Sequence, residues 1–133
     1  MTVRSHALAR ALTTYDSVQV RSQVDAASKG ELAALLIDGA LDSLVQARGH
    51  LQHCAHEPMA LAIARASRIL YGLQSALDQD TAGDLAQQLY DLYGFALRRL
   101  VQVNATDDAH MLEQVILLVQ SIAMAWTSVT RKH

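Results

Sequence analysis

The densest group of potential metal ligands lies between positions 50 and 56. His50, His53, Cys54 and His56 fall within this short stretch, and imidazole and thiolate are good Zn²⁺ ligands. On a continuous helix, His50 and Cys54 would lie on neighbouring faces, as would His53 and His56. Zinc sites usually draw ligands from more than one element and orient them with carboxylates, whereas these four crowd one helix end just before Pro58. The sequence therefore favours a His-rich helix end, which suits the negative end of the helix dipole, and predicts no bound metal.

Other residue groups that could support catalysis lack the partners that their chemistry needs. A di-iron helical bundle uses about four Glu and two Glu-x-x-His motifs, but the chain has only Glu31, Glu57 and Glu113 and no such motif. Asp38 and Asp42 lie four residues apart, a spacing more typical of a solvated helix face than of a catalytic pair. No nucleophile motif or Gly-rich phosphate loop is present in the sequence. We therefore expect a protein that is not an enzyme and needs no cofactor.

Charge and composition narrow the class of protein further. The chain carries 11 Lys and Arg against 13 Asp and Glu, and the adjacent cations Arg98 and Arg99 are typical of a solvated edge. A nucleic-acid partner is not expected, because such proteins concentrate basic charge on one face. The single cysteine excludes an internal disulfide and fits a reducing compartment. No signal peptide is apparent, and the longest apolar stretches, at 32–37 and 115–119, are too short to span a bilayer. These features predict a cytoplasmic protein that does not insert into membranes.

Four long segments with helical periodicity must position these residues. The chain has 22 Ala and 20 Leu, which favour helix, and only 6 Gly and 1 Pro, which argues against many turns. Apolar residues recur at three- and four-residue steps over 28–53, 58–79, 84–104 and 107–130. We expect a Ser28–Glu31 capping box at the first start, Pro58 at the second and Asp107 as the N-cap of the fourth. Because the connections are short, the sequence predicts one all-α domain, residues 1–133, folded as an antiparallel up-down four-helix bundle.

The N-terminal stretch, residues 1–27, has a different pattern. Leu12 and Tyr15 have helical spacing, whereas the valines from Val18 to Val24 fall on even steps with polar residues between them. This pattern predicts an N-terminal arm in which a short helix turns into an extended stretch, with a five-helix bundle as the alternative.

An ordered set of short motifs resembles the FliS family of flagellin export chaperones. The set comprises Tyr15-Asp-Ser-Val-Gln-Val-Arg-Ser-Gln-Val24, Ala27-Ser28, Glu31-Leu32, Leu36-Ile-Asp-Gly-Ala40, Leu77-Asp-Gln79, Leu92-Tyr93, Leu97-Arg-Arg-Leu100, Asn104 with Asp107, and Ala125-Trp126. The resemblance covers nearly the whole chain in order. Three positions differ from the family pattern: Lys29 stands where the family has Pro, Ile37 where it has an aromatic residue, and Gly94 where it has an acidic one. The last two should reshape a local surface.

The resemblance implies a function that composition does not. Members of this family hold the C-terminal region of newly made flagellin in the cytoplasm, prevent its premature polymerisation and deliver it to the flagellar export gate. A disordered flagellin segment can wrap a small bundle as short helices and bury apolar stripes. The implied partner contacts are Leu12, Tyr15, Val18, Ile37, Leu92, Tyr93 and Leu97. The rival interpretations are a metal-binding bundle and a helical adaptor or homodimer unrelated to export. Without its partner the chain is expected to be a monomer or a homodimer.

The same resemblance gives the arm an expected role. Leu12 and Tyr15 are three residues apart, so on a helix they would share one face and form a small apolar plug. We expect the arm, up to about Val24, to act as a movable lid over the partner groove. The alternative is that Tyr15 is an ordinary core residue.

Overall fold

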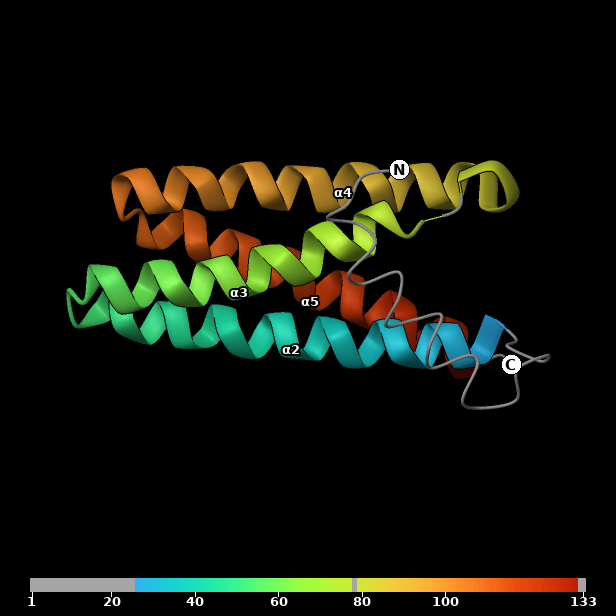
Figure 1. The fold of residues 1–133 in the computed structure, drawn as a ribbon, viewed down its shortest axis with the longest axis horizontal. Coiled ribbons are helices and arrows are strands. Elements are labelled where there is room, and N and C mark those ends of the chain that lie inside the picture. Colours follow the sequence, from blue (N-terminus) through green and yellow to red (C-terminus); the bar gives the residue numbers. More distant parts are fainter. Residues whose placement is uncertain (1–25, 78, 132–133) are drawn as a thin grey trace.

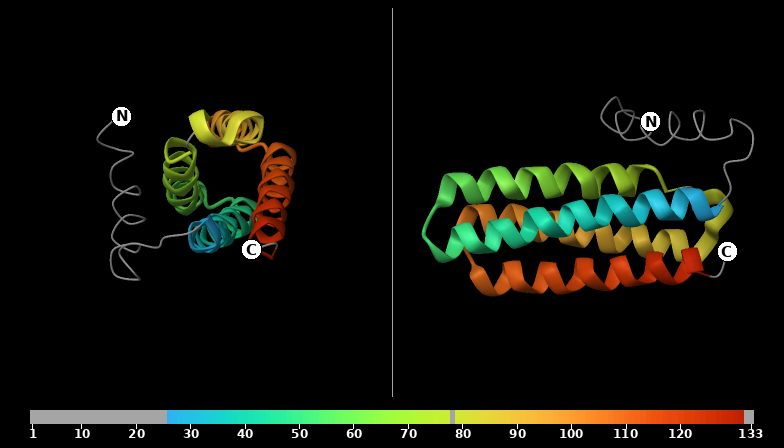
Figure 2. Two further views of the ribbon diagram at one scale, coloured as in Figure 1. Left: turned by 90° about the vertical axis from the view of Figure 1, so that its right-hand side faces the viewer. Right: turned by 90° about the horizontal axis from the view of Figure 1, so that it is seen from below.

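Four helices make up the described part of the chain in the computed structural model, which covers residues 26–77 and 79–131. They are α2 (Ala26–Gln52), α3 (His56–Ser75), α4 (Gln79–Thr106) and α5 (Ala109–Arg131). Successive helices run in opposite directions (Figure 1). The end-on view in Figure 2 places them at the corners of a square, with α2 diagonal to α4. This arrangement confirms the predicted all-α, antiparallel four-helix bundle.

Large apolar side chains from all four helices meet in one core. Those that are almost completely buried are Ile37, Leu44, Met59, Ile63, Leu70, Tyr93, Leu100, Val103, Leu112, Val115, Ile116 and Ile122. Burying one aliphatic or aromatic side chain of this size stabilises the folded state by roughly 1.5–3 kcal/mol before conformational entropy is counted. Because every helix contributes, removal of any one of them would expose apolar surface on its neighbours.

The first two helices begin before the predicted positions. Helix α2 already includes Ala26, so Ser28 is not its N-cap and the predicted capping box at this start is wrong. Helix α3 begins at His56, and Pro58 lies in its first turn. The first four N–H groups of a helix have no intrahelical acceptor, so the missing N–H of proline breaks no helical hydrogen bond there.

The start of α5 uses a different cap from the predicted one. The Met111 N–H donates to Asp108 Oδ1 at 3.0 Å, so Asp108 is the capping residue and the assignment to Asp107 is wrong. Asp107 has a positive φ of 54° and lies in the connection between α4 and α5. It turns the chain, and the residue after it caps the next helix.

Helix α4 starts earlier than predicted and is interrupted. The helix runs from Gln79, but Gly83 within it has φ 63° and ψ −132°, which is not a helical conformation. Residues with a Cβ avoid this region, so glycine is the residue that permits the kink. The predicted start at 84 is therefore wrong for the helix as a whole, while the regular stretch of α4 does begin after Gly83.

Helix α5 is more apolar than the sequence analysis allowed for. Among the described residues, the segment Ala109–Ser128 alone is long and apolar enough to cross a membrane by length and composition, with a mean hydropathy of 1.3. The segment includes Glu113 and several uncharged polar residues, so it is longer than the uninterrupted apolar stretch at 115–119. Leu112, Val119 and Ile122 are buried in the bundle core, whereas Leu117 and Met124 on the same helix are 56% and 72% exposed. The buried side of α5 packs against α2 and α4.

Candidate functional site

Helix α4 carries two neighbouring stripes of side chains that differ in burial. The inner stripe consists of Leu89, Tyr93, Ala96, Leu100 and Val103, all buried in the core. The outer stripe lies beside it and consists of Leu85, Gln88, Leu92, Phe95, Arg99 and Gln102. Successive members of the outer stripe are three or four residues apart, so they share one side of the helix. Leu85, Leu92 and Phe95 nevertheless remain 54%, 38% and 42% exposed. The outer stripe is therefore a helix face with three large apolar side chains that the described fold leaves partly uncovered.

Contacts between α4 and α3 show on which side of α4 the outer stripe lies. Gly94 faces α3, because a Cβ placed on it would lie 3.1 Å from Nε2 of Gln74. The Gln74 side-chain amide also donates to the backbone carbonyl of Tyr90 at 3.0 Å. At about 100° per residue, Leu92 and Phe95 lie on the flank away from this contact. Since α4 lies between α3 and α5 (Figure 2), the outer stripe borders α5.

A fixed cation lies towards the C-terminal end of the outer stripe. The Cζ atom of Arg99 is 5.0 Å from the centroid of the Phe95 ring, within the range of a cation–π contact. Arg99 Nη1 donates to Gln102 Oε1 at 3.2 Å. Among the described residues, the ion pairs are Arg48–Glu113 and His56–Asp107, so no carboxylate of this set pairs with Arg99. Apolar surface and a positioned cation together suit an amphipathic segment.

A partly buried polar contact beneath the outer stripe joins α4 to α5. The indole N–H of Trp126 donates to the Tyr93 hydroxyl at 2.9 Å. Burial raises the pKa of Tyr93 to about 12, because the ionised phenolate would lose its hydration, while the hydrogen bond from Trp126 acts in the opposite direction. The neutral phenol therefore belongs to the folded state.

The structure places the predicted partner contacts in three different environments. Ile37 and Tyr93 are completely buried in the core, and Leu97 is partly buried against it. Leu92 lies in the outer stripe. The remaining three, Leu12, Tyr15 and Val18, lie outside the described residues. Leu85, Phe95 and Arg99 are not among the predicted contacts, although their spacing to Leu92 marks a second stripe beside the core stripe.

The His-rich segment does not form one cluster. Helix α2 ends at Gln52, so the continuous helix that would bring His50 and Cys54 together is not present. His53 Nδ1 donates to the Gly49 carbonyl oxygen at 2.9 Å, within its own segment. His56 Nδ1 lies 2.8 Å from Oδ1 of Asp107 in the connection between α4 and α5. Within residues 26–77 and 79–131, no three His, Cys, Asp or Glu side chains are grouped so that they could hold a metal ion.

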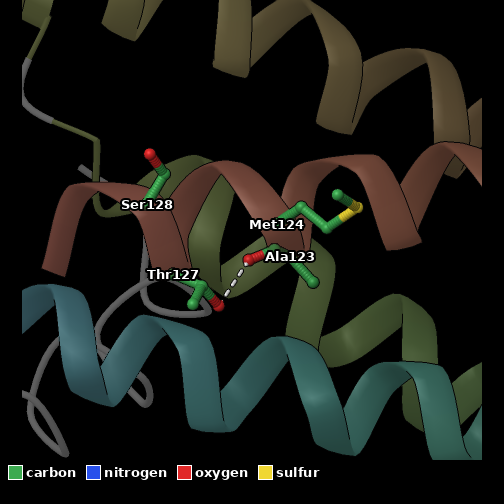
Figure 3. Close-up of a pocket in the computed structure, with 4 residues that line it drawn as sticks. All are labelled: Ala123, Met124, Thr127 and Ser128. Atoms are coloured by element: carbon green, nitrogen blue, oxygen red, sulfur yellow. Dashed lines mark hydrogen bonds between the residues drawn. The ribbon is translucent and has the colours of Figure 1, made fainter. Parts of the chain in front are cut away.

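A hollow of about 310 Å³ lies on the surface of α5. The described residues that line it are Ala123, Met124, Thr127 and Ser128, all from one helix (Figure 3). The Thr127 hydroxyl donates to the Ala123 carbonyl oxygen at 3.0 Å. None of these four side chains is charged, and none can act as an acid or base near neutral pH. The polar groups that line the hollow are the two hydroxyls of Thr127 and Ser128.

Comparison with known proteins gives a consistent result. The family model described as "Flagellar protein FliS" matches residues 11–133. The flagellar secretion chaperone FliS of Salmonella typhimurium is 37% identical over 125 residues, which cover 93% of each chain. The flagellar secretion chaperone FliSB of Pseudomonas aeruginosa is 32% identical over 121 residues, which cover 91% of this chain and 96% of that protein. The Escherichia coli FliS chaperone is 34% identical over 119 residues, 89% of this chain and 88% of its own.

These matches span almost the whole chain, including all four helices of the bundle. They agree with the ordered motifs in the sequence and with the four-helix bundle. The chain therefore belongs to the FliS family of flagellar secretion chaperones.

Proposed function

We propose that this protein binds the C-terminal region of flagellin in the cytoplasm, and that the outer stripe of α4 is part of the binding surface. The observation that supports this surface is the exposure of Leu85, Leu92 and Phe95 along one side of a regular helix. An amphipathic helix commonly binds by laying its apolar face on such a stripe. The family membership supports flagellin as the partner.

The physical task is to cover apolar segments until export. A terminal segment that is disordered before assembly would otherwise pair its apolar stretches with other copies and polymerise early. When such a segment folds on the bundle, apolar burial drives binding, while the ordering of the segment costs on the order of 2–5 kcal/mol. This cost keeps the complex separable. We propose that the chaperone then presents the bound flagellin to the flagellar export gate.

The other proposed contact residues take different roles in this proposal. Ile37 and Tyr93 are buried, so they shape the bundle beneath the binding surface, and Leu97 is partly buried against the core, outside the outer stripe. Leu12, Tyr15 and Val18 remain proposed contacts in an N-terminal lid. Replacement of Leu12 and Tyr15 by alanine should change peptide affinity and leave the melting temperature nearly unchanged. A much lower melting temperature with unchanged affinity would assign both residues to the core.

Calorimetric titration with a synthetic peptide of the flagellin C-terminal region tests the proposal. We expect one peptide per chain and a negative heat-capacity change, the marker of apolar burial. The variant Leu92→Ala/Phe95→Ala should lower the affinity at least about tenfold, since a few well-placed apolar residues carry most of the binding energy at an interface.

A matched control uses exposed apolar residues on other helices. Leu35 on α2 and Leu61 on α3 are 68% and 61% exposed, and Leu35→Ala/Leu61→Ala should leave the affinity almost unchanged. Absence of binding heat at several temperatures, with a folded protein, would overturn the proposed function. Equal losses in the two double variants would remove α4 as the binding surface. Sedimentation of the wild-type chain alone would show whether a second copy covers the stripe instead.

A further inference from the structure

The geometry points to Arg99 as a residue that selects a carboxylate on the bound segment, so that the outer stripe takes an amphipathic helix with an acidic side chain beside its apolar face. This inference rests on the proposed binding of a flagellin segment to α4. It adds a chemical requirement that apolar burial alone does not impose, because any apolar helix could cover Leu85, Leu92 and Phe95.

The contacts of Arg99 hold its charge within the outer stripe. The stack on Phe95 and the hydrogen bond to Gln102 keep the guanidinium along the helix surface. A guanidinium has five N–H donors, and the bond to Gln102 uses one of them. The remaining donors can form a bidentate pair with a carboxylate, which is among the stronger polar contacts in proteins. Because the side chain is already positioned, little rotamer freedom is lost when the pair forms.

Three other arginines on these helices, Arg48, Arg65 and Arg98, are placed differently. Arg48 is paired with Glu113 at 3.0 Å, and Arg65 donates to Gln46 at 2.9 Å. Arg98 is adjacent to Arg99 in sequence but lies about 100° around the helix, on the side of Gly94. A Cβ on Gly94 would lie 3.3 Å from Arg98 Nη1. Arg98 therefore has the same charge as Arg99 on the same helix, but it lies outside the outer stripe.

The spacing along α4 sets where the acidic residue should lie. Leu85, Leu92 and Arg99 follow each other at intervals of seven residues, which on a helix corresponds to about 10 Å per interval. A helix packed along the outer stripe would contact Leu92 with an apolar residue. Its carboxylate would then lie about two helical turns further along, next to Arg99 and Phe95.

Charge reversal at the two adjacent arginines tests the inference. The probe is the synthetic peptide of the flagellin C-terminal region used above, titrated into the full chain. Arg99→Glu should weaken binding roughly tenfold or more, which corresponds to at least about 1.4 kcal/mol. The matched control Arg98→Glu makes the same change in net charge and should weaken binding less than about threefold, since it affects only the long-range field. Arg99→Lys, which keeps the charge but loses the planar fork, should fall between wild type and Arg99→Glu.

Peptide variants identify the carboxylate itself. Each Asp and Glu of the peptide is replaced in turn by Lys. One of these Lys-substituted peptides should bind the Arg99→Glu variant more tightly than it binds the wild-type chain. Arg99→Gln, checked for folding by circular dichroism, separates loss of the cation from damage to the helix. Equal weakening by Arg98→Glu and Arg99→Glu, or unchanged affinity of Arg99→Glu and Arg99→Gln, would overturn the inference while leaving the proposed function intact. If the wild-type chain does not bind the peptide, both fail.

Discussion

Helices α2 and α4 have nearly equal lengths, 27 and 28 residues, and occupy diagonal corners of the bundle, yet they use their surfaces differently. Helix α2 places Ala33, Ala40 and Ala47 against its neighbours at seven-residue intervals, all buried. At Gly39, an added Cβ would already touch Ile69 of α3 at 3.6 Å. Small residues let helix axes approach closely, so α2 packs extensively on both α3 and α5.

Helix α4 puts bulkier residues at its inner positions and packs less extensively on the same two neighbours. Five of its large apolar side chains remain exposed, namely Leu85, Tyr90, Leu92, Phe95 and Val101, against Leu35 and Val45 on α2. Close packing by small residues makes α2 the structural helix of the pair. Looser packing by large residues leaves more apolar surface exposed on α4.

Truncation of a core leucine in α2 should have the largest effect on stability. Leu44 is completely buried, and Leu44→Ala should lower the free energy of unfolding by about 2–5 kcal/mol through lost burial and the cavity left behind. The measurement is urea unfolding followed by far-ultraviolet circular dichroism. Leu35→Ala on the same helix removes an exposed side chain and should change stability by less than about 0.5 kcal/mol. Similar losses in both variants would contradict the assignment of α2 as the packing helix.

Alkaline pH should weaken the contact between α4 and α5 through Tyr93. The pKa of its phenol is about 12 in the folded chain against 10.0 for a solvent-exposed tyrosine, so between these pH values the folded state keeps a proton that the unfolded state has lost. Stability is therefore fully present below pH 10 and falls by about 1.4 kcal/mol per pH unit above it, until the folded pKa is passed.

Unfolding curves between pH 9 and pH 12, read from the fluorescence of the single Trp126, measure this loss. Tyr93→Phe should be less stable at neutral pH by roughly 1–3 kcal/mol, because the partly buried indole N–H of Trp126 loses its acceptor. The same variant should lose less stability than wild type above pH 10. Parallel alkaline losses in both proteins would show that Tyr93 is not the responsible group.

Alanine at two glycines should act in opposite directions on the two helices. Gly83 has a positive φ within α4, so Gly83→Ala should cost about 1–3 kcal/mol through backbone strain. Gly49 lies inside α2 with nothing within 4 Å of an added Cβ, so Gly49→Ala should stabilise the protein by about 0.5–1 kcal/mol. Thermal melting of the two single variants gives the signs. A stabilising Gly83→Ala would mean that the kink in α4 is not required by the fold.

Removal of the ion pair between α2 and α5 should have the smallest effect. Arg48 and Glu113 lie 3.0 Å apart, and their side chains are 39% and 45% exposed. Water and salt screen such a pair, so a double-mutant cycle with Arg48→Gln and Glu113→Gln should give a coupling energy of about 0.2–1 kcal/mol. The coupling should shrink in 1 M salt. A larger, salt-independent value would show that this pair, and not small-residue packing, holds α2 against α5.

The sequence by itself determined the architecture of this protein and its family. Apolar residues at three- and four-residue steps predict helices wherever they recur, and short connections force neighbouring helices to be antiparallel, so both follow from local spacing. The ordered motifs from Tyr15 to Trp126 indicated the family, because such motifs depend on the amino-acid sequence alone. Helix ends were predicted less well, since Asp107 and Asp108 are equally good caps in sequence and the turn geometry selects between them.

Only the tertiary structure decided which side chains are available to a partner. Leu92 and Tyr93 are adjacent and were predicted to have the same role, yet one lies in the outer stripe and the other is buried against Trp126. His56 finds its carboxylate partner in Asp107, 51 residues away, and the four potential zinc ligands are not brought together. The physical reason is that burial depends on how closely a neighbouring helix approaches. The distance between two helices is set by side chains of several helices at once. It therefore cannot be predicted from the residue spacing within a single helix.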